Sequence, residues 1–180
     1  AERRPEGLFA PLARQDWETA LTVILHSPHY TKRVNSGEHS PLHVAIRKGA
    51  PVEVVTALLE AYPNATTTQN RYNSLPCHYA CYNGISSEGM KMLLRGNPDA
   101  AGVANKYGET PMQCLNVCKW HFFADEKEQV RNDLNQLPSY WKSKEQQELL
   151  QCALEETDRR RYMRRSVGKI ILGRQMDNND

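Results

Sequence analysis

Cysteine and histidine side chains at helical spacing are the residues of this chain best suited to binding a metal ion. The two cysteine pairs are Cys77-x-x-x-Cys81 and Cys114-x-x-x-Cys118, and His78 and His121 lie close to them. Four thiolates, or thiolates together with imidazoles, can complete a tetrahedral zinc site. The spacing therefore raises a zinc hypothesis, which depends on whether the elements that carry these residues bring them together.

Two other short motifs suggest covalent modification, and neither indicates catalysis. Asn64-Ala65-Thr66 matches the N-glycosylation pattern, and Arg164-Arg165-Ser166-Val167 resembles a site for a basophilic kinase. Such short patterns often match by chance. The sequence contains no glycine-rich phosphate loop, no G-x-S-x-G elbow and no H-E-x-x-H motif. We therefore expect no enzyme activity, no cofactor and no small-molecule substrate.

One phrase recurs along the chain at a constant step. It reads Ser40-Pro41-Leu42-His43-Val44-Ala45, then Leu75-Pro76-Cys77-His78-Tyr79-Ala80, and more weakly Thr110-Pro111-Met112-Gln113-Cys114-Leu115. The step is 76 − 41 = 35 residues, and 111 − 76 is again 35. Other columns keep this offset: Asn35/Asn70/Asn105, Gly49/Gly84, Leu58-Leu59/Leu93-Leu94 and Pro63/Pro98. A step shared by so many columns shows an internal repeat.

Each repeat predicts two antiparallel helices. Proline suits the first turn of a helix, and Ser40 or Thr110 before it can act as the cap. Gly49 and Gly84 would end the first, inner helix. The second, outer helices are predicted at Val52–Ala61 and Ser87–Arg95, with paired leucines turned inward and Pro63 and Pro98 ending them.

The repeat alignment indicates that the cysteines do not form a zinc site. Cys77 aligns with Leu42, and Cys81 aligns with Ile46, both predicted core positions. Cys114 and Cys118 align with Val44 and Lys48, on a neighbouring and more open face, so the two cysteine pairs point in different directions. The count of five cysteines is odd, which favours reduced thiols in an intracellular compartment.

The T-P-L-H-x-A-like phrase followed by an apolar helix ending in Leu-Leu resembles the ankyrin repeat. The resemblance implies an all-α fold, an ankyrin-like α-solenoid of helix-turn-helix repeats, and the pattern of the tail itself adds a helical C-terminal appendage. It also implies that His43 and His78 join neighbouring loops by hydrogen bonds. The function it implies is protein–protein interaction through the inner-helix face and the loop tips.

The repeat domain is predicted to span residues 1–136, with repeats at about 8–34, 35–69, 70–104 and 105–136. The first repeat is degenerate: Leu8 stands where the histidine would be, Pro11 interrupts the inner helix, and Asp16 caps an outer helix over Trp17–Leu25. Terminal repeats expose one face to water and are often atypical. The closing outer helix is predicted at Asp125–Gln136.

Residues 137–180 are predicted to form a helical C-terminal extension with a basic segment. Leu137-Pro138-Ser139 breaks the array, and Ser143 with Gln146 forms a capping box for the next helix. The basic residues are Arg159, Arg160, Arg161, Arg164, Arg165 and Lys169. Three interpretations stay open: a solvated helix, a dock onto a larger complex of which the chain is a structural subunit or assembly factor, and contact with nucleic acid or an anionic membrane.

Composition narrows the class of protein. The net charge is +2 with 24% charged residues, which is too mild to predict nucleic-acid binding by the whole chain. No run of 18 apolar residues occurs. The expected location is the cytoplasm or nucleus, with an organelle as the alternative. The first residue is not methionine, so a processed protein and an excerpt of a longer one both stay open.

The predicted binding face combines tyrosines with basic residues. The inner-helix positions contribute Val44, Arg47, Lys48, Tyr79, Tyr82, Asn83 and Lys119, and the loop tips contribute Arg71, Tyr72, Lys106 and Tyr107. Tyrosine and arginine are enriched in binding hot spots, and a basic rim favours a partner protein with an acidic surface. The alternative for Tyr79 and Tyr82 is that they fill gaps between the inner helices.

Overall fold

The computed structural model describes residues 7–117, 124–136 and 138–143. Within these ranges every regular element is helical and there is no strand, so the fold is an all-α repeat solenoid. The inner helices are α1 (Phe9–Arg14), α3 (Pro41–Arg47), α5 (Pro76–Asn83) and α7 (Pro111–Val117). The outer helices are α2 (Trp17–His26), α4 (Val52–Ala61), α6 (Ser87–Gly96) and α8 (Ala124–Asn135).

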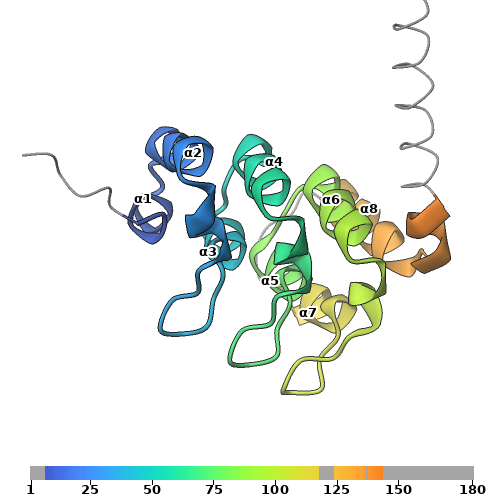
Figure 1. The fold of residues 1–180 in the computed structure, drawn as a ribbon. Coiled ribbons are helices and arrows are strands. Elements are labelled where there is room, and N and C mark those ends of the chain that lie inside the picture. Colours follow the sequence, from blue (N-terminus) through green and yellow to red (C-terminus); the bar gives the residue numbers. More distant parts are fainter. Residues whose placement is uncertain (1–6, 118–123, 137, 144–180) are drawn as a thin grey trace, which may run out of the picture. The chain divides into compact units, whose positions relative to one another are not determined.

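The helices form two layers in chain order. Each inner helix contacts the next inner helix, and each outer helix contacts the next outer helix. In Figure 1 the outer helices run along the upper side, the inner helices lie below them, and long loops project from the lower edge. These loops are the predicted projections at Asn70–Ser74 and Asn105–Glu109, with an equivalent loop at Asn35–His39.

Side-chain caps begin the helices where the sequence predicts them. The Oγ of Ser40 accepts a hydrogen bond from the His43 amide at 3.4 Å. Asp16 accepts one from the Thr19 amide at 3.1 Å, and hydrogen bonding to Thr19 lowers the pKa of this carboxyl. Gly49 and Gly84 follow α3 and α5 with φ of 68° and 89°, a conformation that glycine adopts without steric cost.

Short 3₁₀ helices follow three outer helices, a feature that the sequence did not predict. They are η1 (Pro28–Lys32), η2 (Pro63–Thr67) and η3 (Pro98–Gly102). Each proline begins a new turn, since its missing amide hydrogen is not needed there. The turns also join neighbours: the Thr66 hydroxyl donates to the Gly96 carbonyl at 3.0 Å. Thr66 of the glycosylation-like pattern therefore has a structural role.

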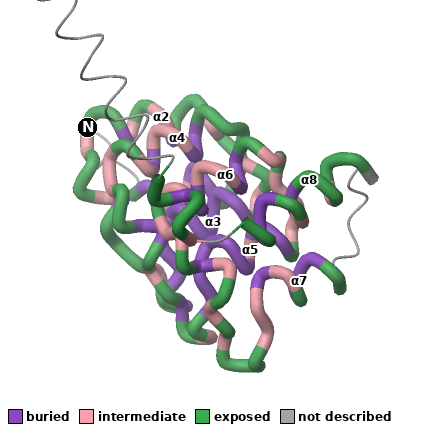
Figure 2. Tube along the Cα trace, turned by 90° about the vertical axis from the view of Figure 1, so that its right-hand side faces the viewer, coloured by how far each residue is buried: buried purple, intermediate pink, exposed green. Residues whose placement is uncertain are grey.

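The core lies between the two layers and runs through successive repeats, shown as the purple trace in Figure 2. Leu58, Leu93 and Leu94 are at most 1% exposed, as predicted. Leu59 is only partly buried, so the prediction of a fully buried pair was wrong at this position. Adjacent residues of a helix point about 100° apart, which turns Leu59 toward the edge of the interface.

Both ends of the array differ from the prediction. Pro11 lies inside α1 and is buried rather than interrupting the helix, because it occupies the first turn, where its missing amide hydrogen has no intrahelical partner. Residues 138–143 are helical, so Ser143 does not begin a helix, and Gln146 of the predicted capping box lies outside the described residues. Trp141 is 1% exposed in the core of the repeat unit, which extends to this residue. The predicted boundary after residue 136 thus lies before a core side chain.

Candidate functional site

Asparagine side chains build the projecting loops in three successive repeats. The Asn70 Oδ1 accepts hydrogen bonds from the amides of Tyr72 and Ser74, at 2.9 and 3.1 Å. Asn35 and Asn105 make the same pair of bonds in their own loops. The Lys106 amide also donates to the Tyr72 carbonyl at 2.8 Å, which joins two neighbouring tips. The tips are therefore held in a fixed conformation.

Two histidines join the inner helices to the loops that follow. The Nδ1 of His43 accepts from the Ser40 amide at 3.3 Å, and its Nε2 donates to the Ser74 carbonyl at 3.0 Å. His78 repeats this arrangement with the Leu75 amide and the Glu109 carbonyl. A carbonyl can only accept, so Nε2 carries a hydrogen in both rings. The amide N–H can only donate, so Nδ1 carries none, and both rings are therefore neutral. Burial lowers the pKa of His43 to about 4 and also lowers the pKa of His78. The linking role that the resemblance implied is confirmed.

The Tyr79 hydroxyl connects two repeats beneath the surface. It accepts from the Asn70 Nδ2 at 3.0 Å and lies 2.6 Å from the His39 Nε2. Since the amide can only donate, the phenolic hydrogen goes to His39. Burial lowers the pKa of His39, and the charges of Arg47 and Arg71 lower it further. The chain of bonds fixes the Tyr79 ring against His43, with centroids 5.3 Å apart.

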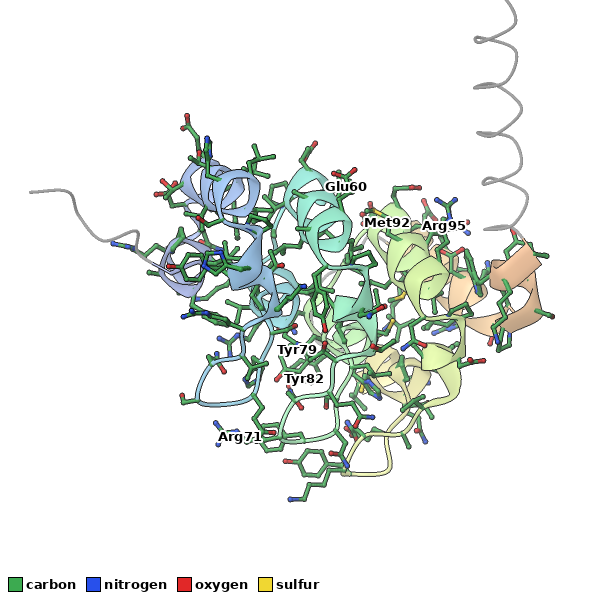
Figure 3. All side chains as sticks on the ribbon, in the orientation of Figure 1. Glu60, Arg71, Tyr79, Tyr82, Met92 and Arg95 are labelled. Atoms are coloured by element: carbon green, nitrogen blue, oxygen red, sulfur yellow. The ribbon has the colours of Figure 1, made fainter. Side chains whose placement is uncertain are left out.

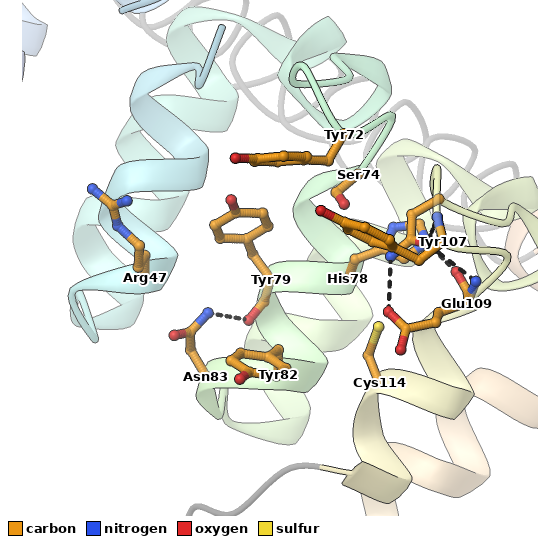
Figure 4. Close-up of a pocket in the computed structure, with 11 residues that line it drawn as sticks. Arg47, Tyr72, Ser74, His78, Tyr79, Tyr82, Asn83, Tyr107, Glu109 and Cys114 are labelled. Carbon is orange, nitrogen blue, oxygen red and sulfur yellow. Dashed lines mark hydrogen bonds between the residues drawn. The ribbon is translucent and has the colours of Figure 1, made fainter. Parts of the chain in front are cut away.

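A pocket of about 320 Å³ opens beside Tyr79, between α3, α5, α7 and two loop tips (Figure 4). Tyr72 and Tyr107 form one wall, with ring centroids 6.0 Å apart and an interplanar angle of 27°. Its complete lining is Arg47, Tyr72, Ser74, His78, Tyr79, Tyr82, Asn83, Asn105, Tyr107, Glu109 and Cys114. Its volume is at the small end of the range of about 300–1,000 Å³ for ligand pockets.

Charge is distributed unevenly around this pocket. In Figure 4, Arg47 lies across from Tyr72 and Glu109 lies on the opposite side, near His78. The Arg71 guanidinium lies 5.7 Å from the centroid of the Tyr72 ring. The Asn105 amide donates to the Glu109 carboxylate at 3.2 Å. One side of the pocket is therefore basic, and the opposite side carries a hydrogen-bonded acid.

The structure brings most of the predicted binding residues together. Six line the pocket: Arg47, Tyr72, Tyr79, Tyr82, Asn83 and Tyr107. Arg71 stands on the Tyr72 side, whereas Lys48 and Lys106 are not part of the lining. Figure 3 shows Arg71, Tyr79 and Tyr82 on the loop side, away from Glu60, Met92 and Arg95 of the outer helices. Their role in binding stays a prediction.

Val44 does not belong to the open face. It is 2% exposed, so its assignment to the binding surface was wrong. The inner helices pack side by side. Val44, the first residue of the repeat column that also contains Tyr79 and Cys114, therefore faces a neighbouring helix rather than water. Tyr79, in the same column, is half-buried and bonded, which supports the gap-filling alternative for this tyrosine. Tyr82 is 57% exposed and does not fill a gap in this way.

The cysteines that the structure describes are buried thiols. Burial raises the pKa of Cys77 to about 12 and that of Cys114 to about 11, so both are protonated. Cys114 lines the pocket, as its predicted place on the more open face suggests, but it is only 4% exposed there. The described ranges contain no group of three or more potential metal ligands. Cys118 and His121, the other members of the zinc hypothesis, lie outside the described residues.

Several predictions fall outside the described residues altogether. These are Lys119, the Ser166 kinase motif and the basic tail from Arg159 to Lys169. The helices that the structure describes include none long and apolar enough to cross a membrane.

Sequence reasoning did not name five lining residues of the pocket and one supporting residue as part of the binding surface. The lining residues are Ser74, His78, Asn105, Glu109 and Cys114, and His39 holds Tyr79 from below. The repeat contains a signal for three of them, since His39, Ser74 and Glu109 occupy one column directly before the helix phrase. That column supplies the carbonyls that the histidines of the preceding repeat bind.

Comparison with known families agrees with this architecture. Residues 38–68, which include α3, α4 and η2, match the family model of the ankyrin repeat. The segment is thus an ankyrin repeat within an all-α repeat solenoid. Ankyrin repeats are in general protein–protein interaction modules without enzymatic activity. A comparison with curated proteins finds no significant match.

Proposed function

We propose that this chain is a non-enzymatic protein-binding module that contacts its partner through the inner-helix and loop-tip face around the Tyr79 pocket. The observation that carries the proposal is the pocket itself, which gathers four tyrosines and one arginine from consecutive repeats. Tyrosine and arginine dominate binding hot spots, because each buries a large area when a partner covers it.

The exposure of the tyrosines supports this function. Tyr82 is 57% exposed and Tyr107 is 68% exposed. An exposed aromatic ring gains apolar contacts when a partner excludes water from it, and its hydroxyl can still hydrogen-bond at the edge of the interface. Neither ring is needed to fill the core, so selection for packing alone does not account for both.

Rigidity of the site supports it further. The asparagine bonds hold the loop tips, and the His39–Tyr79–Asn70 contacts hold the floor of the pocket. A preformed site loses less conformational entropy on binding than a mobile one. The geometry thus favours recognition of a partner that fits an existing surface.

Affinity capture from cells of the native source, with matched variants, tests the proposal. The immobilised wild-type protein is compared with Tyr82→Ala, Tyr107→Ala and Leu25→Ala. Leu25 is 74% exposed on α2 and serves as the control, since it lies outside the pocket. We expect the two tyrosine variants to lose the captured protein, with a cost of about 2 kcal/mol or more each, and the control to keep it. Equal capture by all four proteins would refute this site.

An intracellular location is part of the same proposal. Its support is the chemistry of Cys77 and Cys114, two free thiols that are buried and protonated in the described array. Imaging of the full-length natural protein in its own cells tests this, and an exclusively extracellular signal would contradict it.

A further inference from the structure

The basic side of the pocket carries positive charge without a matching acid. Arg47 is exposed at the end of α3, and Arg71 is exposed in the neighbouring loop. Among the residues that the structure describes, neither guanidinium forms an ion pair with a carboxylate. Arg71 instead lies near the Tyr72 ring. A ligand group that approaches this side meets two cations, and it does not have to displace an acid from them.

The hydroxyl groups of the pocket wall add to the same preference. Figure 4 shows the hydroxyls of Tyr72 and Tyr107 pointing toward the side of the pocket where Arg47 lies. Phenolic hydroxyls can donate hydrogen bonds to an anion, and an arginine can hold a carboxylate with two parallel bonds. The basic side therefore suits a carboxylate.

The interior of the pocket suits an uncharged ring. Tyr79 and Tyr82 lie one turn apart along α5 (Figure 4), and Cys114 of α7 lines the same pocket. Aromatic rings pack favourably edge to face against tyrosine, at centroid distances of about 4.5–7 Å. The volume of about 320 Å³ leaves room for a side chain.

Glu109 restricts where an acidic group of a ligand can bind in the pocket. Its carboxylate lies on the side away from Arg47 and accepts the Asn105 amide. A second carboxylate placed there would be repelled, since like charges in a partly buried site are unfavourable. An acidic residue of a ligand is thus directed to the Arg47 side only.

We propose that the pocket binds an acidic linear peptide segment of a partner protein, with an aspartate or glutamate on Arg47 and a nearby aromatic side chain between Tyr79, Tyr82 and Cys114. This inference rests on the proposed function and specifies the chemistry of the partner. Arg47 and the tyrosine hydroxyls select the acid, and the ring contacts select the aromatic residue.

Selection from a random twelve-residue peptide library displayed on phage tests the inference. Wild-type protein and the Arg47→Glu variant are tested in parallel. Lys91→Glu is the control, because it reverses a charge in the same way but on the outer helix α6. We expect the wild type and the control to enrich peptides with an acid close to an aromatic residue. We expect Arg47→Glu to lose this enrichment.

Calorimetry with one selected synthetic peptide then gives the size of the effect. We expect Arg47→Gln to weaken binding about 10- to 100-fold, the usual worth of a hydrogen bond to a charged group. Arg47→Glu should weaken it further, and Lys91→Glu should leave it unchanged. Thermal unfolding of each variant shows that the fold is kept, and Arg47→Gln preserves the test if the charge reversal disturbs α3.

Three results would overturn the inference. Wild-type selection could enrich peptides without an acidic residue, Arg47→Gln could bind as tightly as wild type, or no peptide could be enriched at all. In the first two cases, loss of the same peptides by Tyr82→Ala would leave the proposed function standing. In the third, affinity capture with the tyrosine variants decides the proposed function separately.

Discussion

The outer-helix side and the inner-helix side of the array expose different kinds of residue. Glu60, Glu88 and Lys91 lie on the outer helices, whereas Tyr82, Tyr107 and Arg47 lie on the inner-helix and loop side. Charged side chains keep a surface solvated, while exposed aromatic rings beside an arginine that forms no ion pair within the described residues favour contact with a partner. Both helix layers contribute to the core, and under the proposed function the inner-helix and loop side is the one that contacts a partner.

The largest expected effect is a loss of stability caused by a substitution in the outer helix α4. Leu58 is 1% exposed between α4 and its neighbours, so Leu58→Ala should lower the free energy of unfolding by about 2–5 kcal/mol. Urea unfolding measures this loss. Leu59→Ala is the matched control, and it should cost clearly less because Leu59 is only partly buried. Equal losses from both changes would mean that the two side chains are buried alike.

The second effect concerns His43, which joins α3 to the next loop beneath the pocket. The pKa of His43 is about 4 in the folded protein and 6.5 in the unfolded chain, so the folded state binds fewer protons. Stability is then full above pH 6.5 and falls as the pH drops from 6.5 toward 4, by ~3 kcal/mol from this residue. Unfolding curves at pH 7, 6, 5 and 4 measure the decline.

His43→Gln is the informative variant for this junction. In the third phrase of the repeat, Gln113 accepts the Thr110 amide with its side chain, as His43 accepts the Ser40 amide. The variant should keep the cap, lose the bond to Ser74 and weaken the pH dependence between 6.5 and 4. A pH profile identical to wild type would show that His43 is not the titrating group.

The third effect tests the floor of the pocket. Tyr79→Phe removes the hydroxyl that accepts from Asn70 and donates to His39, and it leaves both buried partners without this bond. We expect a loss of about 1–3 kcal/mol in the free energy of unfolding. Tyr107→Phe is the control at a position that is 68% exposed, and it should change stability by less than about 0.5 kcal/mol.

The smallest expected effect on stability comes from residues with positive φ in the loop tips. Glu38, Asn73 and Gly108 occupy one column, with φ of 59°, 54° and 78°. A non-glycine residue pays roughly 1–2 kcal/mol in this conformation, and glycine's greater freedom in the unfolded chain costs about 0.5–1. Glu38→Gly should therefore raise stability by up to about 1 kcal/mol in thermal unfolding. Gly108→Ala should lower it, and stabilisation by both changes would contradict this explanation.

The periodic part of the fold was predictable from the sequence. Proline, histidine and glycine at a step of 35 determine where inner helices begin, how they join the next loop and where they end. The predicted binding residues could be grouped for the same reason, since alignment by repeats places Arg47 and Tyr82 in one column and Asn83 in the next. These predictions used local rules that every repeat obeys.

What could not be predicted depends on packing between repeats. Val44 and Tyr79 share a column, yet one is buried in the core and the other lines the pocket, because their neighbours differ. Trp141 packs into the core from beyond the predicted boundary, and no repeat column includes it. The single-copy residues at the ends and in the pocket are therefore the ones that periodicity leaves undetermined.

Nuclear magnetic resonance with a selected acidic peptide or a captured partner tests the central claim most directly. The backbone amide signals of the labelled protein are followed as the ligand is added. Binding through the inner face predicts shift changes that concentrate at Arg47, Tyr72, Tyr79, Tyr82 and Tyr107. The amides of α4 and α6 on the outer side should stay close to their original positions. Changes that concentrate on the outer helices, with the tyrosine signals unmoved, would contradict the account.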